Sequence, residues 1–162
     1  MLEQTSIFGR NINLIEHKDV DRLVTELADS PNYSVFFCNV HMLMLSQEDE
    51  ALANAMDKAD WVFADGMPVA WLQSRLSGRE ANVIQGYEIM LSVCERSVTC
   101  GEKIGFIGST QEVMRSLVGK LSKQFKGLSV TYQSCPPFMQ GELVSTPAEL
   151  QAINDSGIKW LF

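Results

Sequence analysis

The chain has 162 residues, of which 46% are apolar, 20% charged and 9% aromatic, a composition typical of globular proteins that excludes the disordered, collagen-like and coiled-coil classes. A chain of about 150 residues buries roughly 70% of its unfolded surface, so a single domain needs no disulfide or structural metal. The net charge of −7 has the wrong sign for binding phosphate backbones, so nucleic acid is not expected as a partner.

The four cysteines, Cys38, Cys94, Cys100 and Cys135, form no C-x-x-C pair, and the chain has only two histidines. A zinc site is therefore not predicted, and the thiols are expected to be reduced and mostly buried. The N-terminal segment lacks the basic region and the apolar stretch of roughly 7–15 residues that mark a signal peptide. No apolar run approaches the ~18–20 residues of a membrane span. These features predict a reducing, cytoplasmic compartment.

Short apolar runs alternate with helical patterns, which is typical of parallel strands joined by crossover helices. The first half is expected to contain a hairpin over 6–15 that turns at Gly9-Arg10-Asn11, and a helix with apolar positions over 20–27. A strand over 33–38 ends at Asn39, and a strand over 61–64 leads into Asp65. Between them, Ser46 and Asp49 predict the capping box of a helix. That helix should carry inward Leu52, Ala55, Met56 and Ala59.

The second half continues the alternation. A helix over 68–76 should end at Gly78, and a weak apolar run at 83–84 precedes a helix that begins near Gly86. A strand over 104–107 leads to a helix with a Ser109/Glu112 capping box, and a strand follows over 130–132. That helix should have a buried stripe of Val113, Leu117, Leu121 and Phe125. A third capping sequence, Thr146, Pro147 and Glu149, precedes a last strand over 158–162. We predict an α/β protein with a Rossmann-like, open, mainly parallel sheet and helices on both faces.

Chemistry-bearing residues gather at the predicted strand ends. Ligands of open parallel sheets bind at the carboxyl ends of the strands, where loops and helix N-termini converge. The candidate site residues are Asn39 and His41, Asp65 and Gly66, Gly86, Tyr87 and Glu88, Gly108 and Ser109, and Pro137 and Phe138.

Asp65 ends an apolar strand and precedes a glycine, which should leave its carboxylate at the rim of the sheet. Partial desolvation there would make the carboxylate a stronger general base. A capping or turn role for this Asp-Gly pair is the alternative.

The other strand ends are chemically compatible with a nucleotide sugar. The Gly108-Ser109-Thr110 turn opens a helix, whose free N–H groups could hold a diphosphate, or it is an ordinary tight turn. Asn39 and His41 suit sugar hydroxyls or a nucleobase edge, although His41 could simply start a helix. Tyr87 and Glu88 suit a polar ligand or a helix-start cap.

Five segments, taken in order, resemble the WecG/TagA/CpsF glycosyltransferase family. They are N-V-H-M at 39–42, A-D-W-V-F-A-D-G-M-P-V at 59–69, G-Y-E-I at 86–89, I-G-F-I-G-S at 104–109 and P-P-F at 136–138. The A-D-x-x-x-x-D-G-x-P segment and the late P-P-F are the specific parts. The resemblance extends from about Ile7 to Phe162.

The resemblance implies an inverting, metal-independent transferase. It would move an N-acetylmannosamine-type sugar, or a related one, from a UDP-sugar donor to a lipid-diphosphate-linked acceptor in surface polysaccharide biosynthesis. The general base would be Asp65, and Asn39, Gly86 and the Gly108-Ser109 turn match the donor-binding positions. No cofactor and no metal are expected, and the chain has no D-x-D motif. The full-length form would work at the inner face of the cell membrane, and a homo-oligomer is possible.

The sequence departs from the family pattern at three places. Val83 stands where the family usually has arginine, with Glu88 rather than aspartate in the motif that follows. Phe37 stands where many members carry threonine. The chain also ends before the family's G-x-G-x-P-K-Q-E segment and basic C-terminal region, so we interpret residues 1–162 as a single glycosyltransferase domain lacking its C-terminal part. Less stability, more self-association and weaker membrane affinity are expected of such a shortened form.

Two other functions compete with transfer. A non-catalytic nucleotide-sugar-binding module would use the same strand ends without turnover. A dinucleotide-dependent reductase is disfavoured, because the glycine fingerprint is incomplete and no acidic ribose-binding residue follows at the required spacing.

Overall fold

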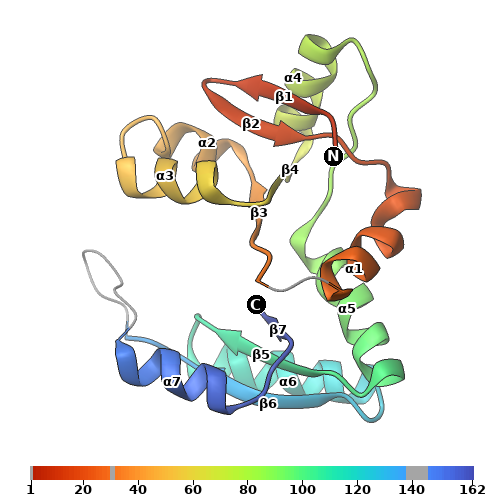
Figure 1. The fold of residues 1–162 in the computed structure, drawn as a ribbon, viewed down its shortest axis with the longest axis vertical. Coiled ribbons are helices and arrows are strands. Elements are labelled where there is room, and N and C mark those ends of the chain that lie inside the picture. Colours follow the sequence, from red (N-terminus) through yellow and green to blue (C-terminus); the bar gives the residue numbers. More distant parts are fainter. Residues whose placement is uncertain (1, 30–31, 138–145) are drawn as a thin grey trace. The chain divides into compact units, whose positions relative to one another are not determined.

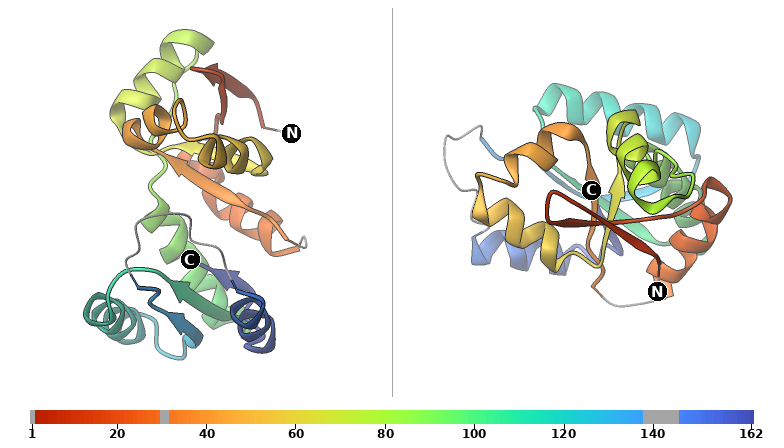
Figure 2. Two further views of the ribbon diagram at one scale, coloured as in Figure 1. Left: turned by 90° about the vertical axis from the view of Figure 1, so that its left-hand side faces the viewer. Right: turned by 90° about the horizontal axis from the view of Figure 1, so that it is seen from above.

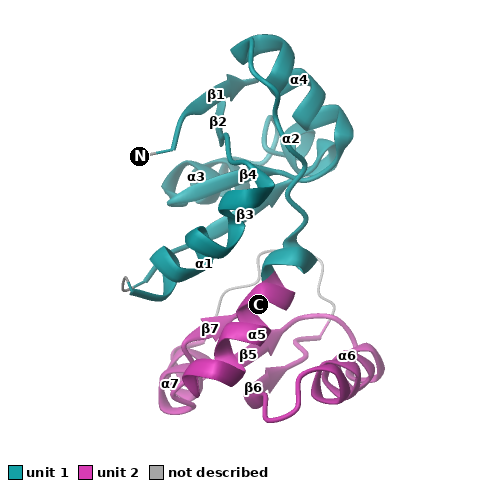
Figure 3. Ribbon diagram, turned by 90° about the vertical axis from the view of Figure 1, so that its right-hand side faces the viewer, with its two compact units in different colours: residues 1–89 teal, residues 90–162 magenta. Residues whose placement is uncertain are grey.

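The computed structural model describes residues 2–29, 32–137 and 146–162 and shows helices and strands in the predicted alternation (Figure 1). The chain divides into two compact units, residues 1–89 and residues 90–162 (Figure 3). Each unit carries its own sheet. The predicted α/β class is confirmed, with open, mainly parallel sheets and alternating helices, whereas the single domain stays a prediction.

The sheet of unit 1 has four strands in the order β1-β2-β4-β3. β1 (Gln4–Ile7) and β2 (Arg10–Asn13) form an antiparallel hairpin. β4 (Trp61–Ala64) runs parallel to β2 and to β3 (Val35–Cys38). The predicted hairpin is confirmed, but its turn lies at Phe8-Gly9, where both residues have positive φ, 48° and 78°. Two positive φ values match the twist of a two-residue hairpin, which explains the earlier turn.

Five helical segments lie wholly in unit 1. They are a 3-10 turn (His17–Asp19), α1 (Val20–Asp29), α2 (Val40–Leu45), α3 (Glu50–Lys58) and α4 (Met67–Ser77). The predicted helices over 20–27 and 68–76 are confirmed, and α4 ends at Gly78 in a left-handed conformation (φ 70°) as expected.

The predicted capping box before α3 is wrong. Asp49 caps α3 by accepting a hydrogen bond from the Leu52 N–H at 3.0 Å. The Ser46 hydroxyl instead donates to the Leu43 carbonyl at 2.8 Å, at the end of α2. Ala55, predicted to point inward, is exposed. The reason is α2 itself, a helix the sequence analysis did not predict, which places Ser46 at a helix end rather than a helix start.

The two faces of this sheet carry different side chains, because successive strand residues alternate. On one face, β-strand residues such as Cys38 and Ala64 form a single buried cluster with residues of α2, α3 and α4. On the other face lie Phe37 and Phe63, with ring centroids 6.4 Å apart. The start of α5 (Gly86–Cys100) packs on the Phe37 ring of this face at Gly86. Helices therefore pack against both faces of the unit 1 sheet.

Two buried polar side chains tie the hairpin to the rest of unit 1. The Asn13 carboxamide oxygen accepts from the Val62 N–H at 2.9 Å, and the Gln73 amide donates to the Ile12 carbonyl at 2.9 Å. Both side chains are buried. Because buried backbone groups need partners, these bonds complete the ladder where β2 and β4 pair at one residue only.

The sheet of unit 2 has three parallel strands in the order β6-β5-β7. They are β5 (Lys103–Ile107), β6 (Ser129–Ser134) and β7 (Trp160–Leu161). Unit 2 also contains helices (Figure 2). They are the part of α5 (Gly86–Cys100) from residue 90 on, α6 (Gln111–Gln124) and α7 (Pro147–Asp155). The three strands predicted here are confirmed, and so is the Thr146/Glu149 capping box of α7.

The start and the buried stripe of α6 differ from the prediction. Its cap is Thr110, whose hydroxyl accepts from the Val113 N–H at 3.3 Å, and not Ser109. The helix therefore begins one residue later. Its fully buried residues are Met114 and Leu121, whereas Val113 is 52% exposed.

No helix in the described part of the chain combines the length and the apolar character needed to cross a membrane.

Gly105 marks the tightest packing in unit 2. A Cβ at this position would lie 2.9 Å from Ile158 Cδ1 and 3.0 Å from Tyr132 Cβ. The absence of a side chain therefore lets β5 lie close to its neighbours in the centre of the sheet.

We expect Gly105→Ala to lower the free energy of unfolding by about 1–3 kcal/mol, because the added methyl overpacks this contact. Gly119→Ala is the matched control, since a Cβ in α6 would meet nothing within 4 Å. It should raise stability by roughly 0.5–1 kcal/mol through helix propensity. Chemical denaturation measures both, and equal effects of the two variants would contradict the packing argument.

Candidate functional site

Three chain segments meet at the carboxyl edge of the unit 1 sheet. The Asp65 N–H donates to the Cys38 carbonyl at 2.9 Å, and the Ile84 N–H donates to the Ala64 carbonyl at 2.9 Å. Cys38 and Ala64 are themselves partners in the parallel register. The ends of β3 and β4 and the segment before α5 are therefore fixed side by side. The run at 83–84, predicted as a weak strand, is irregular but hydrogen-bonded at this point.

Asp65 stands at the centre of this edge, directly after β4, and is half-buried. α4 has Gly66 as its N-cap and no side-chain cap bond. Within the described residues, the Asp65 carboxylate has no hydrogen-bond or ion-pair partner, so a capping role is not observed. The alternative turn role stays open, because Asp65 and Gly66 connect β4 to α4. A half-buried carboxylate without a fixed partner can accept a proton from a substrate hydroxyl.

Asn39 and His41 follow the end of β3. The Asn39 side-chain oxygen caps α2 by accepting from the Met42 N–H at 3.0 Å. Its side-chain NH₂ group is left to donate to a ligand. His41 lies in the first turn of α2 and is exposed. The predicted pair is therefore next to the Asp65 strand end, with Asn39 partly engaged in capping.

Two glycines shape this edge for different reasons. Gly66 has φ 109°, a conformation that favours glycine and turns the chain from β4 into α4. Gly86 packs closely against a ring, because a Cβ there would lie 3.0 Å from Phe37 Cδ2. In the sequence, Phe37 is notable only as a departure from the family pattern. In the structure, its ring contacts Gly86, the first residue of α5.

Tyr87 and Glu88 follow in the first turn of α5. The Gln85 N–H donates to Glu88 Oε2 at 3.4 Å, so Glu88 acts as a helix-start cap, which was one of its two predicted roles. Tyr87 is 56% exposed and free to contact a ligand.

Cys38, the last residue of β3, is at the same edge, and its thiol is buried. Burial and, as the smaller cause, the neighbouring Asp65 carboxylate raise the pKa of Cys38 to about 11. The thiol is therefore protonated and neutral at physiological pH, and adds no second negative charge beside Asp65.

The predicted diphosphate-binding turn lies in unit 2. Gly108 has φ 121° and Ser109 φ 60°, and the Gly108 N–H donates to the Ser134 carbonyl at 2.9 Å. A positive φ at a serine is a strained conformation often found at binding sites. The turn follows β5 and precedes the 14-residue helix α6, as predicted.

Pro137 is exposed, after the end of β6. Phe138, the last predicted site residue, lies outside the described residues. Within residues 2–29, 32–137 and 146–162, no three His, Cys, Asp or Glu side chains lie close enough together to hold a metal ion.

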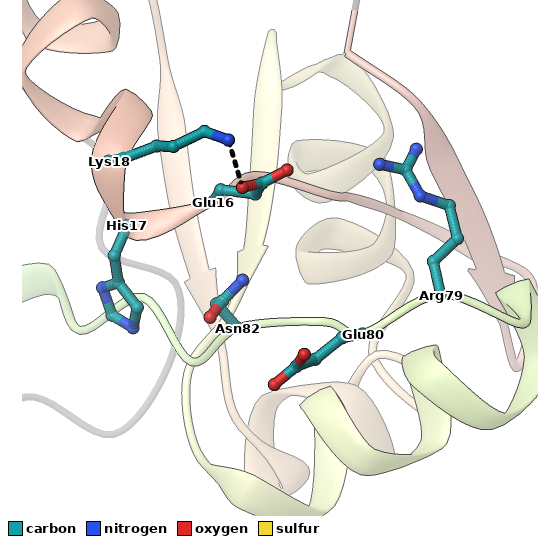
Figure 4. Close-up of a pocket in the computed structure, with 6 residues that line it drawn as sticks. All are labelled: Glu16, His17, Lys18, Arg79, Glu80 and Asn82. Atoms are coloured by element: carbon teal, nitrogen blue, oxygen red, sulfur yellow. Dashed lines mark ion pairs between the residues drawn. The ribbon is translucent and has the colours of Figure 1, made fainter.

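A polar groove of about 410 Å³ lies in unit 1, outside the predicted set of residues (Figure 4). Its lining residues are Glu16, His17, Lys18, Arg79, Glu80 and Asn82. Lys18 pairs with Glu16 at 2.7 Å, and Arg79 pairs with Glu3 outside the groove, so both cations are compensated. The groove could not be predicted from the sequence, because the two segments that line it, 16–18 and 79–82, are more than 60 residues apart.

The fold, and the ends of β3 and β4 joined to the segment before α5, define an α/β protein with a carboxylate at the carboxyl edge of parallel strands. The model described as "Glycosyl transferase WecG/TagA/CpsF family" matches residues 5–162, and the chain belongs to that family. Because it belongs to this family, the protein is a glycosyltransferase. A comparison with curated proteins finds no match.

The four thiols differ in exposure, which predicts an order of reactivity. Cys38 and Cys94 are buried, Cys100 is exposed and Cys135 is intermediate. Burial raises the pKa of Cys94 to about 11, as it does for Cys38. The expectation of mostly buried thiols therefore holds for two of the four.

At pH 8 we expect an aromatic disulfide reagent to modify Cys100 first, because it is exposed, and to modify Cys38 and Cys94 only after unfolding. Cys100→Ser should remove the fast phase, and Cys94→Ser should leave it unchanged. Rapid modification of Cys38 in the folded protein, detected by peptide mass spectrometry, would contradict its burial.

Proposed function

We propose that this glycosyltransferase moves an N-acetylmannosamine-type sugar from a UDP donor to a lipid-diphosphate-linked acceptor, with inversion and without a metal. The observation that carries the proposal is the half-buried Asp65 carboxylate directly after β4, which has no hydrogen-bond or ion-pair partner among the described residues. Family membership supports sugar transfer in general. The particular sugar and acceptor rest on the resemblance of the motifs.

In the proposed reaction, the oxygen of the acceptor hydroxyl attacks the anomeric carbon of the donor sugar. Asp65 removes the proton from that hydroxyl at the same time. The bond between that carbon and the diphosphate oxygen breaks, and its electron pair leaves with UDP. One attack from the opposite side inverts the anomeric configuration. A single base suffices for this chemistry, provided that the leaving group is stabilised.

The Gly108-Ser109-Thr110 turn is proposed to stabilise the leaving diphosphate. Free N–H groups at the start of α6 and the positive end of its dipole favour negative charge. The absence of a side chain at Gly108, where a Cβ would meet nothing within 4 Å, leaves room for close approach of a ligand.

Asn39, His41, Gly66, Gly86, Tyr87 and Glu88 are proposed to surround the sugar. Asn39 can donate from its side-chain NH₂ group and His41 from its ring, and both are exposed. Amide and imidazole groups at hydrogen-bonding distance would orient hydroxyls, while Gly66 lets a ligand approach the backbone closely. Pro137 and Phe138 are proposed to contact the donor after β6.

We expect Asp65→Asn to fold normally and bind the donor, but to lower the transfer rate by roughly 10²–10⁴-fold, the usual loss when a general base is removed. The amide keeps the shape of the side chain and loses the basic lone pair. Release of UDP with a lipid-diphosphate-linked acceptor is the measurement. Asp29→Asn, an exposed carboxylate in the same unit, is the control and should keep full activity.

Near-normal turnover of folded Asp65→Asn would remove Asp65 from the mechanism. Donor binding without any UDP release by the unaltered protein would favour the alternative, a nucleotide-sugar-binding module without catalysis.

UDP is expected to bind without added divalent metal, and Gly108→Val should weaken binding by blocking the backbone. Gly101→Val is the matched control, because Gly101 also has a positive φ (69°) and open space around it, but lies before β5. Both substitutions strain the backbone, so only the effect on UDP should differ. Calorimetry in the presence of a chelator measures this, and loss of UDP binding with the chelator would contradict the metal-free assignment.

A further inference from the structure

The polar groove of unit 1 begins at the same carboxyl edge of the sheet as Asp65. β2 and β4 run parallel, with Asn13 opposite Phe63. The carboxyl ends of parallel strands lie at one edge of a sheet. Glu16, which lines the groove shortly after the end of β2, therefore follows that edge as Asp65 does after β4.

The other wall of the groove, the segment 79–82, is joined to the strand end that carries Asp65. The Asn82 side-chain NH₂ group donates to the Ile15 carbonyl at 3.4 Å and so ties the two walls together (Figure 4). Ile84, whose N–H donates to the Ala64 carbonyl at 2.9 Å, follows two positions later. Two residues of extended chain span at most about 7 Å. The Asn82 end of the groove is therefore close to the end of β4.

The charges that line the groove balance. Its two carboxylates are Glu16 and Glu80, and its two cations are Lys18 and Arg79. The hydrogen bond between Lys18 and Glu16 holds the pKa of the carboxyl below its usual value and the pKa of the amine above it, so this pair stays ionised at neutral pH. Arg79 pairs with Glu3.

This balance decides which kind of ligand the groove suits. Both cations already have a carboxylate partner, so a diphosphate would meet the charges of Glu16 and Glu80 without an uncommitted cation in the lining to offset them. A cation would likewise meet Lys18 and Arg79. The groove therefore favours a ligand without net charge over the UDP part of the donor.

The lining offers both donors and acceptors of hydrogen bonds. The carboxylates accept, Lys18 and Arg79 donate, and Asn82 and His17 can do both. A hydroxyl group also donates and accepts, so a ligand with several hydroxyls matches this mixed set. The volume of about 410 Å³ is within the range of small-ligand sites.

An adjoining hollow of about 330 Å³ extends the groove along the 14–16 segment. It shares Glu16, Arg79 and Glu80 with the groove and adds the aliphatic side chains of Leu2 and Leu14. Sugars combine hydroxyls with apolar C–H faces, and the two hollows together present partners for both.

We propose that this groove binds the sugar of the acceptor and presents one of its hydroxyls at the Asp65 edge. The inference rests on the proposed function, in which the acceptor must carry a hydroxyl beyond its diphosphate. The neutral, hydroxyl-rich part of such an acceptor suits the charge-balanced groove, and its diphosphate does not. The groove residues would then select and position the acceptor without touching the reacting atoms.

The first test is the binding of methyl glycosides of neutral hexoses and N-acetylhexosamines, without donor or lipid, followed by NMR of the ¹⁵N-labelled protein. We expect at least one glycoside to shift the Asn82 side-chain amide signals. Glu80→Gln/Asn82→Ala should bind that glycoside at least fivefold more weakly, because two hydrogen-bonding groups of the lining are altered. Glu48→Gln/Asn54→Ala is the matched control, since both residues are exposed in unit 1 outside the groove, and it should bind like the unaltered protein.

The second test is the kinetics of transfer. Glu80→Gln/Asn82→Ala should raise the KM for the acceptor at least fivefold and leave kcat and the affinity for UDP within twofold, because the groove holds the acceptor equally before and during the reaction. The control variant should change none of the three.

Three results would overturn the proposal. One is that no glycoside shifts the Asn82 signals, and another is that the groove variant and the control bind glycosides equally. The third is that UDP or inorganic phosphate shifts these signals and the glycosides do not, because the groove would then be an anion site.

Groove binding and sugar transfer fail separately in this design. If a glycoside binds in the groove but the protein releases no UDP with any lipid-diphosphate-linked acceptor, the proposed function is wrong and the sugar site stands. If the protein transfers sugar and Glu80→Gln/Asn82→Ala changes neither glycoside binding nor the KM for the acceptor, the sugar site is wrong and the function stands.

Discussion

Two backbone hydrogen bonds, from Asp65 to the Cys38 carbonyl and from Ile84 to the Ala64 carbonyl, hold the edge on which the proposed chemistry depends. Each joins residues that are 20 or more positions apart, and the bond from Asp65 to Cys38 extends the parallel pairing of β3 and β4. The carboxyl ends of parallel strands lie at one edge of a sheet. The two bonds therefore hold the segments after β3 and β4 and the segment before α5 next to one another, although they are distant in the sequence. The ring of Phe37 under Gly86 then fixes where α5 begins. Every residue proposed to bind the sugar follows one of these joined segments.

The strand ends were predictable from the sequence, but the contacts among them were not. A β-rich run that stops at Asn39 or Asp65 is a local signal, and both strands end there. The pairing of Phe37 with Gly86 depends on sheet register, which no local pattern contains. The division into two compact units also left no signal, because α5 runs through the boundary at residue 89 without a linker.

The wrong helix starts have a common physical cause. A serine three residues before an acid satisfies the capping pattern at Ser46 and at Ser109. The N–H bonds are instead accepted by Asp49, which is the acid of the first pattern, and by Thr110, which directly follows Ser109. Several short polar side chains near a helix start can cap it, and the one that does so is decided by where the preceding element ends. At 46–49 that element is α2, whose six residues are all apolar except His41. Helical periodicity cannot reveal a segment without a polar face, so the helix and the true cap were missed together.

The charge state of the Asp65 edge follows from what surrounds the carboxylate. An arginine or lysine in a fixed pair with Asp65 would stabilise its charged form and weaken it as a base, but none of the ion pairs among the described residues involves Asp65. Its buried neighbour, Cys38, is neutral, because burial and Asp65 itself raise the thiol pKa to about 11. Asp65 is therefore a half-buried carboxylate directly after β4 that makes no ion pair with the other described residues. We propose that this carboxylate takes the proton from a hydroxyl placed beside it, which is the step that inverting sugar transfer requires of its base.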